Sequence, residues 1–538
     1  MLIYLLFTAL VILICLILSK ISFRLGLPAL LVFMFLGMLF GSDGILKIPF
    51  DNFAAAEQIC SISLIFIMFY GGFGTNWKKG KTVAFPAILL SGAGTIITAA
   101  VTGMFCRYVL KFGFLESMLI GSVISSTDAA SVFSILRSKR LNLKHNTASM
   151  LEIESGSNDP FSNILTVIML SLMNGKTSGS AVGYMVFSQI VYGAAIGVLL
   201  ALTARFILKR VDLSSGGLDS IFVFGTAIVS YALPSLIGGN GYLSAYIAGL
   251  ILGNSHAIEN KKMLVGFFDG ITGLMEMLLF FLLGLLSFPT QLTKIFISGL
   301  AIALFLTLVA RPLAVFAILT PFGCTTKQKI LVSWAGLRGA ASIVFAIMAT
   351  VSPAYTKHDV FHVVFFIVLF SISVQGSLLP LISRKLGMID DRDDVMKTFS
   401  DYSEEEPVQY IKLKIRDGHP WSGMKIRDIH MLPDIIMVLI VRGNRQIIPK
   451  GSTTVMDGDT LILCGPSMDK DNDYTVQLTE IKVDRLHQWL GKQLSQIKFG
   501  SDHLVVLIKR HNRIVIPSGK TVIREDDILI INEAANCQ

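Results

Sequence analysis

The stretch LEIESGSNDPFSNILT, residues 151–166, places a carboxylate and an amide deep inside an apolar segment. It begins about five residues into that segment, so at about 1.5 Å rise per helical residue Asn158 and Asp159 lie near the middle of a membrane. A charge at that depth costs about 2.5 kcal/mol or more and normally faces a wet cavity. We therefore interpret Asp159 as functional; the alternative is an aspartate held in a helix-packing hydrogen bond.

Two neighbours of Asp159 strengthen this interpretation. Pro160 has no N–H, which leaves the carbonyl of Gly156 without its helical donor. Ser155 precedes Asp159 by one helical turn and shares its face. An acid, a hydroxyl and a loosened carbonyl together predict a site for a small, partly dehydrated cation.

The composition is that of a polytopic membrane protein. Of 538 residues, 53% are hydrophobic and 15% charged, with a net charge of +9. Residues 1–386 hold 26 Lys and Arg against 14 Asp and Glu, while the remainder holds 20 against 23. The positive charge therefore belongs to membrane loops, which argues against nucleic-acid binding. The six cysteines show no CxxC spacing, so we expect packing residues and no bound metal other than a transported cation.

Hydropathy predicts about thirteen spans. Alternate loops between them carry 18 Lys and Arg, whereas the opposite loops carry 6. This bias predicts a cell inner (plasma) membrane protein with its N-terminus outside and its C-terminal tail in the cytoplasm. The apolar segments are 2–19, 27–41, 58–74, 83–106, 115–136, 147–173, 181–204, 218–237, 242–255, 267–288, 292–320, 329–351 and 359–383.

Two further charges lie near mid-membrane in unusual surroundings. Asp128 lies among hydroxyls in SVISSTDAASVF, which favours an interrupted helix; a capped packing kink is the alternative. Arg338, bracketed by glycines in WAGLRGAAS, needs an acidic partner, and we predict Glu154. The two spans are fifth of the first six and fifth of the last six, a pattern typical of transporters built from inverted repeats.

Other charges in the spans receive plainer interpretations. Arg311 lies nearer the cytoplasmic end of its span, where snorkelling is expected. Glu152 is close to the cytoplasmic mouth and in reach of water. Glu276, in GLMEMLLFF, has no identifiable partner, and the sequence leaves its role open.

The character of the chain changes after the membrane domain, 1–386. Residues 387–407 are acidic and polar and are typical of a linker. An internal repeat follows with a constant offset of 68, so that RGNRQIIPKGSTTVMDGDTLIL aligns with RHNRIVIPSGKTVIREDDILII. The two copies predict two α+β modules, 408–466 and 476–538.

Each module carries arginine and asparagine at a turn between two strand-like runs. Solvated hairpin turns are one interpretation. The other is a regulatory site for an anionic ligand such as cyclic di-AMP, because arginine binds phosphate in a bidentate manner. The residues are Arg442, Asn444 and Arg445, and Arg510, Asn512 and Arg513.

The membrane domain resembles the NhaP branch of the monovalent cation/proton antiporters, including potassium/proton antiporters of cell-volume regulation. The resemblance is carried by STDAAS at 126–131, ESGSNDP at 154–160 and GLRGA at 336–340. The modules of the tail resemble TrkA-C (RCK-C) domains, ligand-binding modules of potassium transport proteins. No GxGxxG-bearing nucleotide domain precedes them, which weakens an NAD-sensing role.

This resemblance implies roles for individual residues. Asp159 would bind the cation or the proton in turn, and Asn158, where electrogenic relatives carry a second acid, implies one-for-one electroneutral exchange. The family is dimeric and moves a core bundle in an elevator-like manner. The implied ion site comprises Asp159, Asp128, Asn158, Ser155 and Thr127, and the implied structural ion pair is Glu154 with Arg338.

The sequence thus predicts a helical membrane protein with interrupted helices and inverted repeats, followed by a cytoplasmic α+β tail. The expected function is exchange of a monovalent cation for H⁺ in pH and volume homeostasis, without enzymatic activity or a resident cofactor. Potassium is the favoured cation because the tail modules resemble domains of potassium transport proteins. Sodium/proton exchange and a tail-gated cation channel are the alternatives, although no TVGYG-like filter sequence is present.

Overall fold

The computed structural model forms two compact units, Met1–Glu404 and Glu405–Gln538. The residues that it describes are 2–25, 28–75, 77–139, 141–175, 179–211, 217–255, 258, 261–354, 356–390, 408–415, 419–429, 435–443, 445–466, 477–483, 487–497, 503–510, 513–515, 517 and 519–533.

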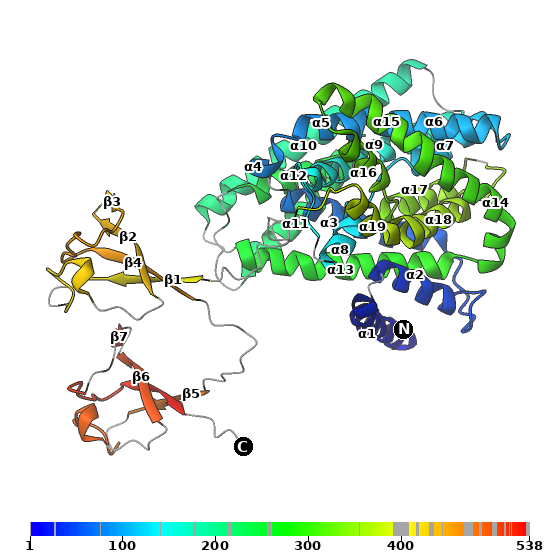
Figure 1. Ribbon diagram of the computed structural model, residues 1–538. Helices are drawn as coiled ribbons and strands as arrows, with labels where there is room; N and C mark the ends of the chain where they lie inside the picture. The colour runs from blue at the N-terminus through cyan, green and yellow to red at the C-terminus, as the bar shows by residue number, and fades with distance from the viewer. Residues whose placement is uncertain are drawn as a thin grey trace. The chain divides into compact units, whose positions relative to one another are not determined.

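The described part of the first unit is built from helices, which group into the thirteen predicted spans (Figure 1). These helices are α1 (Leu2–Leu25), α2 (Ala29–Phe40), α3 (Phe53–Gly74), α4 (Trp77–Gly80), α5 (Ala84–Leu89), α6 (Thr95–Tyr108), α7 (Phe114–Val123), α8 (Ala129–Ser138), α9 (Thr147–Met173), α10 (Gly179–Arg210), α11 (Leu218–Leu236), α12 (Gly241–Gly253), α13 (Lys261–Leu286), α14 (Pro289–Phe305), α15 (Arg311–Leu319), α16 (Thr326–Trp334), α17 (Ala340–Val351), α18 (Val360–Phe370) and α19 (Ser377–Lys385).

Length and composition make these helices membrane spans. Within the described residues, seven helical runs are long and apolar enough to cross a membrane, and five shorter helices are also apolar. The helix α9 has 27 residues, enough to span, but it carries three acids. The predicted class, a polytopic helical membrane protein, is confirmed.

The two predicted interruptions are present. Residues 124–128 separate α7 from α8, and residues 335–339 separate α16 from α17. Neither stretch is helical, so each leaves the carbonyls and N–H groups of two half-helix ends for other partners. Non-helical backbone at membrane depth is tolerated only where it is buried in protein or lines a cavity.

Wider, π-helical turns occur at matching places in the two halves of the unit. The turn η1 (Leu90–Gly94) joins α5 to α6, and η3 (Leu306–Ala310) joins α14 to α15. These are the fourth spans of the first six and of the last six. The turn η1 packs against α15, and η3 packs against α6. A third such turn, η5 (Ser371–Gly376), joins α18 to α19. This correspondence supports the inverted-repeat prediction.

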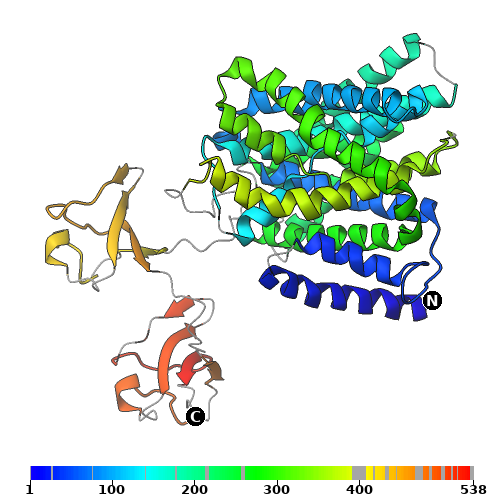
Figure 2. The same ribbon diagram turned by 45° about the vertical axis from the view of Figure 1, so that its right-hand side comes forward.

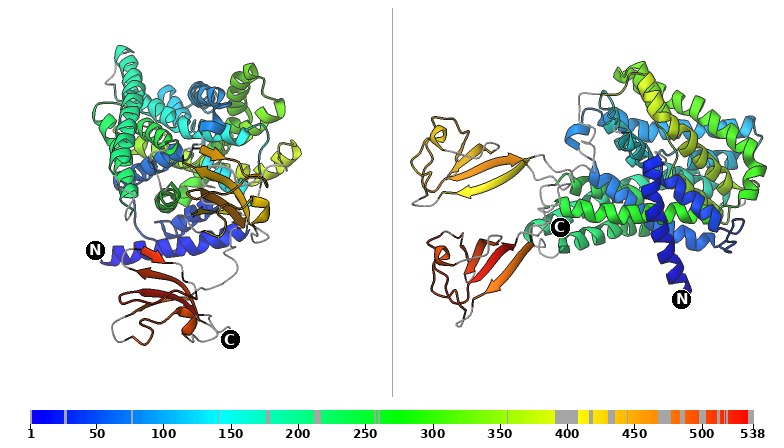
Figure 3. Two further views of the ribbon diagram at one scale, coloured as in Figure 1. Left: turned by 90° about the vertical axis from the view of Figure 1, so that its left-hand side faces the viewer. Right: turned by 60° about the horizontal axis from the view of Figure 1, so that its bottom comes forward.

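Close helix packing surrounds the interrupted pair. The helix α13 packs along α2 and α3, and α12 packs along α3 and α10. Figure 2 shows α1 beside α2 at one edge of the bundle, with α13 next to them. The helix α10 runs along the outside of the bundle (Figure 3), and its exposed face is apolar, as a lipid-facing helix requires.

Each sequence copy in the second unit forms one four-stranded antiparallel sheet. The first sheet has the order β1-β4-β2-β3 and the second β5-β8-β6-β7. In the described residues the helical part of each predicted α+β module is a single 3₁₀ turn, η7 (Ile426–Asp428) or η8 (Leu494–Gln496). The strands are β1 (Val408–Lys414), β2 (Ile436–Arg442), β3 (Arg445–Ile447), β4 (Thr460–Pro466), β5 (Gln477–Lys482), β6 (His503–Arg510), β7 (Arg513–Val515) and β8 (Ile528–Glu533).

The sheets repeat even in their irregularities. The register of β2 against β4 shifts between Met437 and Leu439, and that of β6 against β8 shifts between Val505 and Leu507, the same positions at an offset of 68. β-Bulges of this kind redirect side chains and are built into a fold. The sequence repeat is therefore a structural repeat.

Candidate functional site

The helix α9 divides its polar residues between two faces, as the 3.6-residue period requires. Glu152, Ser155 and Asp159 face a cavity, and Asn158 and Glu154 face the neighbouring elements. Spacings of three and four residues place the first three side chains in one row. The helix continues through Pro160, so the backbone near Asp159 keeps its position despite the missing N–H.

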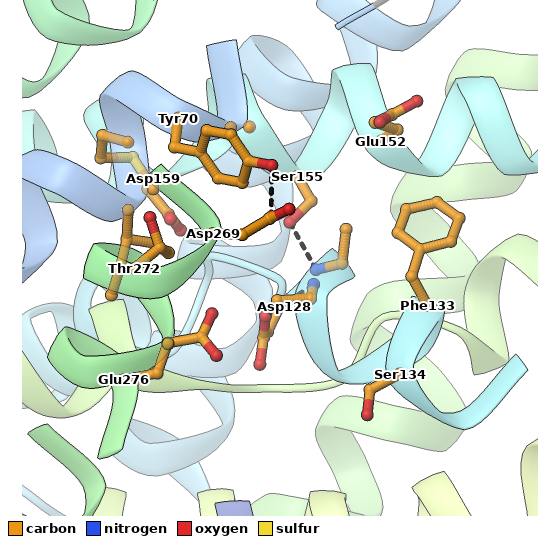
Figure 4. Close-up of a pocket in the computed structure, with 17 residues that line it drawn as sticks. Tyr70, Asp128, Phe133, Ser134, Glu152, Ser155, Asp159, Asp269, Thr272 and Glu276 are labelled. Atoms are coloured by element: carbon orange, nitrogen blue, oxygen red, sulfur yellow. Dashed lines mark hydrogen bonds between the residues drawn. The ribbon is translucent and has the colours of Figure 1, made fainter. Parts of the chain in front are cut away.

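The cavity has a volume of about 430 Å³ and an acidic lining (Figure 4). Five carboxylates line it, and no lysine or arginine is among its described lining residues. The Asp159 side chain is only 6% exposed, and its Oδ1 has no hydrogen bond to any described residue. A buried carboxylate oxygen without a donor is suited to a cation or a proton. The five are Asp128, Glu152, Asp159, Asp269 and Glu276.

The two interrupted helices cross beside this cavity. The Asp128 N–H donates to the Leu337 carbonyl over 2.8 Å, which joins the two extended stretches directly. The Arg338 Nη1 donates to the carbonyls of Ser125 at 2.8 Å and Ser126 at 2.5 Å. The guanidinium thus binds carbonyls at the carboxyl end of α7, where the helix dipole favours positive charge. Arg338 stabilises the interruption itself.

Gly339 allows this crossing. A Cβ at this position would overlap the Asp128 side chain, so only glycine lets the second extended stretch approach the acid so closely.

Asp128 has two roles in the structure. Its Oδ1 accepts from the N–H groups of Ala130 at 3.0 Å and Ser131 at 3.4 Å, and the Ser131 hydroxyl donates to Oδ2. It therefore caps the amino end of α8, as the capped-kink interpretation expects. It also lines the cavity, and its predicted part in ion binding stays a prediction.

The remaining members of the predicted ion site fall into two groups. The Ser155 hydroxyl lines the cavity, donates to the Thr127 carbonyl at 2.7 Å and accepts from the Ala129 N–H at 2.7 Å. Asn158 and Thr127 do not line it. The Asn158 amide donates to the Thr127 Oγ1 at 2.6 Å and accepts from the Thr127 N–H at 3.3 Å. These two residues hold the interrupted stretch against α9.

The predicted ion pair between Glu154 and Arg338 is wrong. The partner of Glu154 is Arg311, whose Nη2 lies 2.6 Å from Oε1 and 2.7 Å from Oε2. The Arg311 side chain is 3% exposed, so the expected snorkelling is wrong too. The π-helical turn η3 ends immediately before Arg311, and such local rewinding has no hydropathy signature. Hydropathy therefore gave no sign that Arg311 would turn inward to Glu154.

Sequence reasoning missed a polar, cavity-lining face on α13. Asp269, Thr272 and Glu276 all line the cavity opposite Asp159 (Figure 4). The Tyr70 hydroxyl donates to Asp269, whereas the buried Thr272 Oγ1 has no hydrogen bond to any described residue. The spacing of three and then four residues is the signal that was available, since it places three polar groups on one face of an apolar helix.

The tail arginines have internal partners. Arg442 donates from Nε and Nη2 to both oxygens of the buried Asp459, each at 2.8 Å. Arg510 binds Asp527 in the same way at 2.8 and 2.7 Å. These pairs hold β2 to β4 and β6 to β8 through the turns before β4 and β8. Both guanidinium groups therefore have partners within their own sheets, and their binding of an anionic ligand stays a prediction. Asn444 and Asn512, and the side chains of Arg445 and Arg513, lie outside the described residues.

The two ion pairs perturb their acids. The Arg442 guanidinium lowers the pKa of Asp459 below its ordinary value. At Asp527 burial alone would raise the pKa, but the hydrogen bonds from Arg510 and the Arg524 N–H outweigh it, so that the pKa is lowered.

Comparison with known proteins gives consistent relatives for both units. Residues 9–385 match the family described as "Sodium/hydrogen exchanger, transmembrane", and residues 411–469 and 478–532 match the TrkA-C domain. The K(+)/H(+) antiporter NhaP2 of Shewanella sp. (strain MR-4) is 32% identical over 83% of this chain and 78% of its own length. The K(+)/H(+) antiporter NhaP of Alkalimonas amylolytica is 31% identical over 84% and 79%.

A solved structure shares the fold of the first unit. That of the sodium proton antiporter MjNhaP1 from Methanocaldococcus jannaschii matches with a TM-score of 0.62 and 25% identity, covering 72% of this chain and 98% of that one. The resemblance to NhaP-type antiporters expected from the three motifs is thus confirmed. The chain belongs to the sodium/hydrogen exchanger family and carries two TrkA-C domains.

Proposed function

We propose that the protein exchanges K⁺ for H⁺ across the bacterial inner membrane, one for one, at the Asp159 carboxylate. The observation that carries this proposal is a buried carboxylate oxygen that accepts no hydrogen bond from any described residue, at the wall of an acidic cavity. Proton and cation compete for the same oxygens. If the occupied site crosses the membrane and the empty, charged site does not, movement of one ion requires return of the other.

Potassium is the proposed cation. Relatives named as K(+)/H(+) antiporters are 31% and 32% identical over more than four fifths of the chain. The Na(+)/H(+) antiporter ApNhaP of Aphanothece halophytica is 27% identical over 62% of it. Sodium/proton exchange is the second candidate. Competition between K⁺ and Na⁺ for transport distinguishes the two candidate functions.

Electroneutral exchange is supported by the place of Asn158. Its neutral amide is bonded to Thr127 outside the cavity, so α9 offers Asp159 as its only acid at this level. Replacing one cation by one proton there leaves the charge of the transported site unchanged. An imposed membrane potential should then leave the exchange rate unaltered.

The remaining features of the proposal concern assembly and control. Loop charges support an N-terminus outside and a cytoplasmic tail. The protein works as a homodimer whose core bundle moves in an elevator-like manner, and the TrkA-C domains regulate it. A nucleotide such as cyclic di-AMP remains the proposed ligand of the tail, and calorimetry on the full chain tests it. A tail-gated channel would instead give ion flux uncoupled from proton movement.

Antiport by the purified chain in proteoliposomes tests the proposal. With a K⁺ gradient and an internal pH dye, the parent protein should move protons, and Asp159→Asn should abolish this movement at every pH. The matched control is Asp219→Asn, the same change at a buried acid of α11 that lies outside the cavity. K⁺-driven proton movement by Asp159→Asn would refute the assignment.

A further inference from the structure

Glu276 lies in the wall between two cavities. Besides the main cavity, a side cavity of about 490 Å³ lies among α1, α2, α8 and α13. Five residues line both spaces, including Ser134, Asp269 and Glu276. The Glu276 carboxylate is thus within reach of the Asp159 cavity from one side and of the side cavity from the other. The exchange mechanism described above gives this half-buried acid no task.

The surroundings of Glu276 are acidic from every element that contributes a charge. Asp269 lies two turns earlier on α13, Asp128 immediately precedes α8, and Asp159 projects from α9. Neither cavity has a lysine or arginine among its described lining residues. Because no basic residue among the described lining faces the Glu276 carboxylate, its available partners are a cation, a proton or water. Its role is therefore tied to the traffic of small positive species.

A buried hydroxyl connects Glu276 to the exchange site. Thr272 precedes Glu276 by one helical turn, is 8% exposed and has an Oγ1 without a hydrogen bond to any described residue. Thr272 and Asp159 both line the main cavity (Figure 4), and neither the Thr272 Oγ1 nor the Asp159 Oδ1 has a hydrogen-bond partner in the described part of the chain. Water between them would find the polar contacts that an ordered water needs.

The side cavity has polar groups along its length. Its walls are mainly aliphatic, but Ser19, Ser134, Asp269 and Glu276 line it. Gly270 and Gly273 leave the α13 wall open, since a Cβ at either position would have no neighbour within 4 Å. With so few oxygen groups among aliphatic walls, this lining suits water better than a metal ion, because a bound cation needs oxygen ligands all round.

We propose that Glu276 is a proton relay, which takes protons from the side cavity and delivers them to Asp159. The inference rests on the proposed antiport and separates the proton route from the cation route. When the cation leaves, protonated Glu276 gives its proton through water to the Asp159 carboxylate. The resulting Glu276 carboxylate then takes a proton from water of the side cavity, so that charge and protons balance. Glu276 remains on α13 and adds no charge to the transported site.

A relay matters most when protons are scarce. For Glu276→Gln we expect the antiport rate to stay within about twofold of the parent at about pH 6.5 and to fall about tenfold or more at about pH 8.5. The KM for K⁺ should be unchanged at both pH values, because the cation site is intact. Glu276→Asp should restore much of the alkaline rate, which a merely structural role would not predict.

A second pair of variants tests the side cavity without changing a charge. Gly270→Leu places a side chain in the side cavity alone, and it should reproduce the alkaline loss of Glu276→Gln. The matched control is Gly266→Leu, one turn earlier on α13. A Cβ at Gly266 also has no neighbour within 4 Å, and Gly266 lines neither cavity. This control should keep the parent's pH profile.

The outcomes separate the relay from the antiport proposal. If the parent shows no K⁺-driven proton movement, or Asp159→Asn retains it, the proposed function fails. If the parent and Asp159→Asn behave as expected but Glu276→Gln lowers the antiport rate equally at all pH values, or raises the KM for K⁺, the relay is refuted. A parent-like profile for Gly270→Leu would refute the side cavity as the proton route.

Discussion

The corrected ion pair of Glu154 makes a quantitative prediction. Both side chains are at most 3% exposed, and one Arg311 nitrogen lies within 2.7 Å of both carboxylate oxygens. Glu154→Gln leaves a buried guanidinium without its counter-charge, which costs about 3–5 kcal/mol. Glu154→Gln combined with Arg311→Met removes both charges, and most of the lost stability should return, because an uncharged pair needs no compensation.

Thermal unfolding of the full chain in detergent measures this effect at one scan rate, since such unfolding is irreversible. The single variant should unfold about 5 °C or more below the parent, and the double variant close to it. The comparison is Glu154→Gln with Arg338→Met, whose effects should add, because Arg338 binds the Ser125 and Ser126 carbonyls. Recovery with Arg338→Met, and none with Arg311→Met, would refute the assignment of the pair.

Three further predictions follow from single contacts. Gly339→Ala pushes a methyl group into Asp128, so antiport in proteoliposomes should fall about tenfold or more while the protein stays folded. Asn158→Ala leaves buried backbone and hydroxyl groups unpaired and should cost about 1–3 kcal/mol in thermal unfolding. The pKa of Asp459 is lowered from 3.8, so its pair with Arg442 contributes stability above pH 3.8 and loses it as the pH falls through the lower pKa of the folded state. Amide exchange of β4, corrected for intrinsic rates, should therefore accelerate over that pH range. Arg442→Met should remove this pH dependence.

The local features of the chain were predictable because they depend on neighbours in sequence. Thirteen apolar segments, two interruptions and a repeat at an offset of 68 follow from hydropathy, glycine content and self-similarity. The depth of Asp159 followed from counting residues along one helix. The structure contains the thirteen segments, the two interruptions and the repeat, and it places Asp159 near the middle of α9.

Partner choice was not predictable in the same way. We predicted Arg338 as the partner of Glu154 and placed Arg311 nearer the cytoplasmic end of its span, whereas the fold turns Arg311 towards Glu154. Arg442 and Arg510 have the chemistry of a phosphate site, yet each is bound to an aspartate 17 residues later. Asn158 was predicted as an ion ligand from its position in the sequence, but its side chain is hydrogen-bonded to Thr127.

By itself, therefore, the sequence determined that this is a membrane protein with a single prominent acid on a polar helix, two broken helices and a duplicated tail. Only the tertiary structure decided which charges meet and that the polar face of α13 completes the cavity opposite Asp159. The reason is physical. The hydropathy of a helix is the sum of contributions from residues adjacent in sequence. An ion pair or a cavity depends instead on the angles and distances between helices, and turning a helix about its axis by one residue position replaces one partner by another.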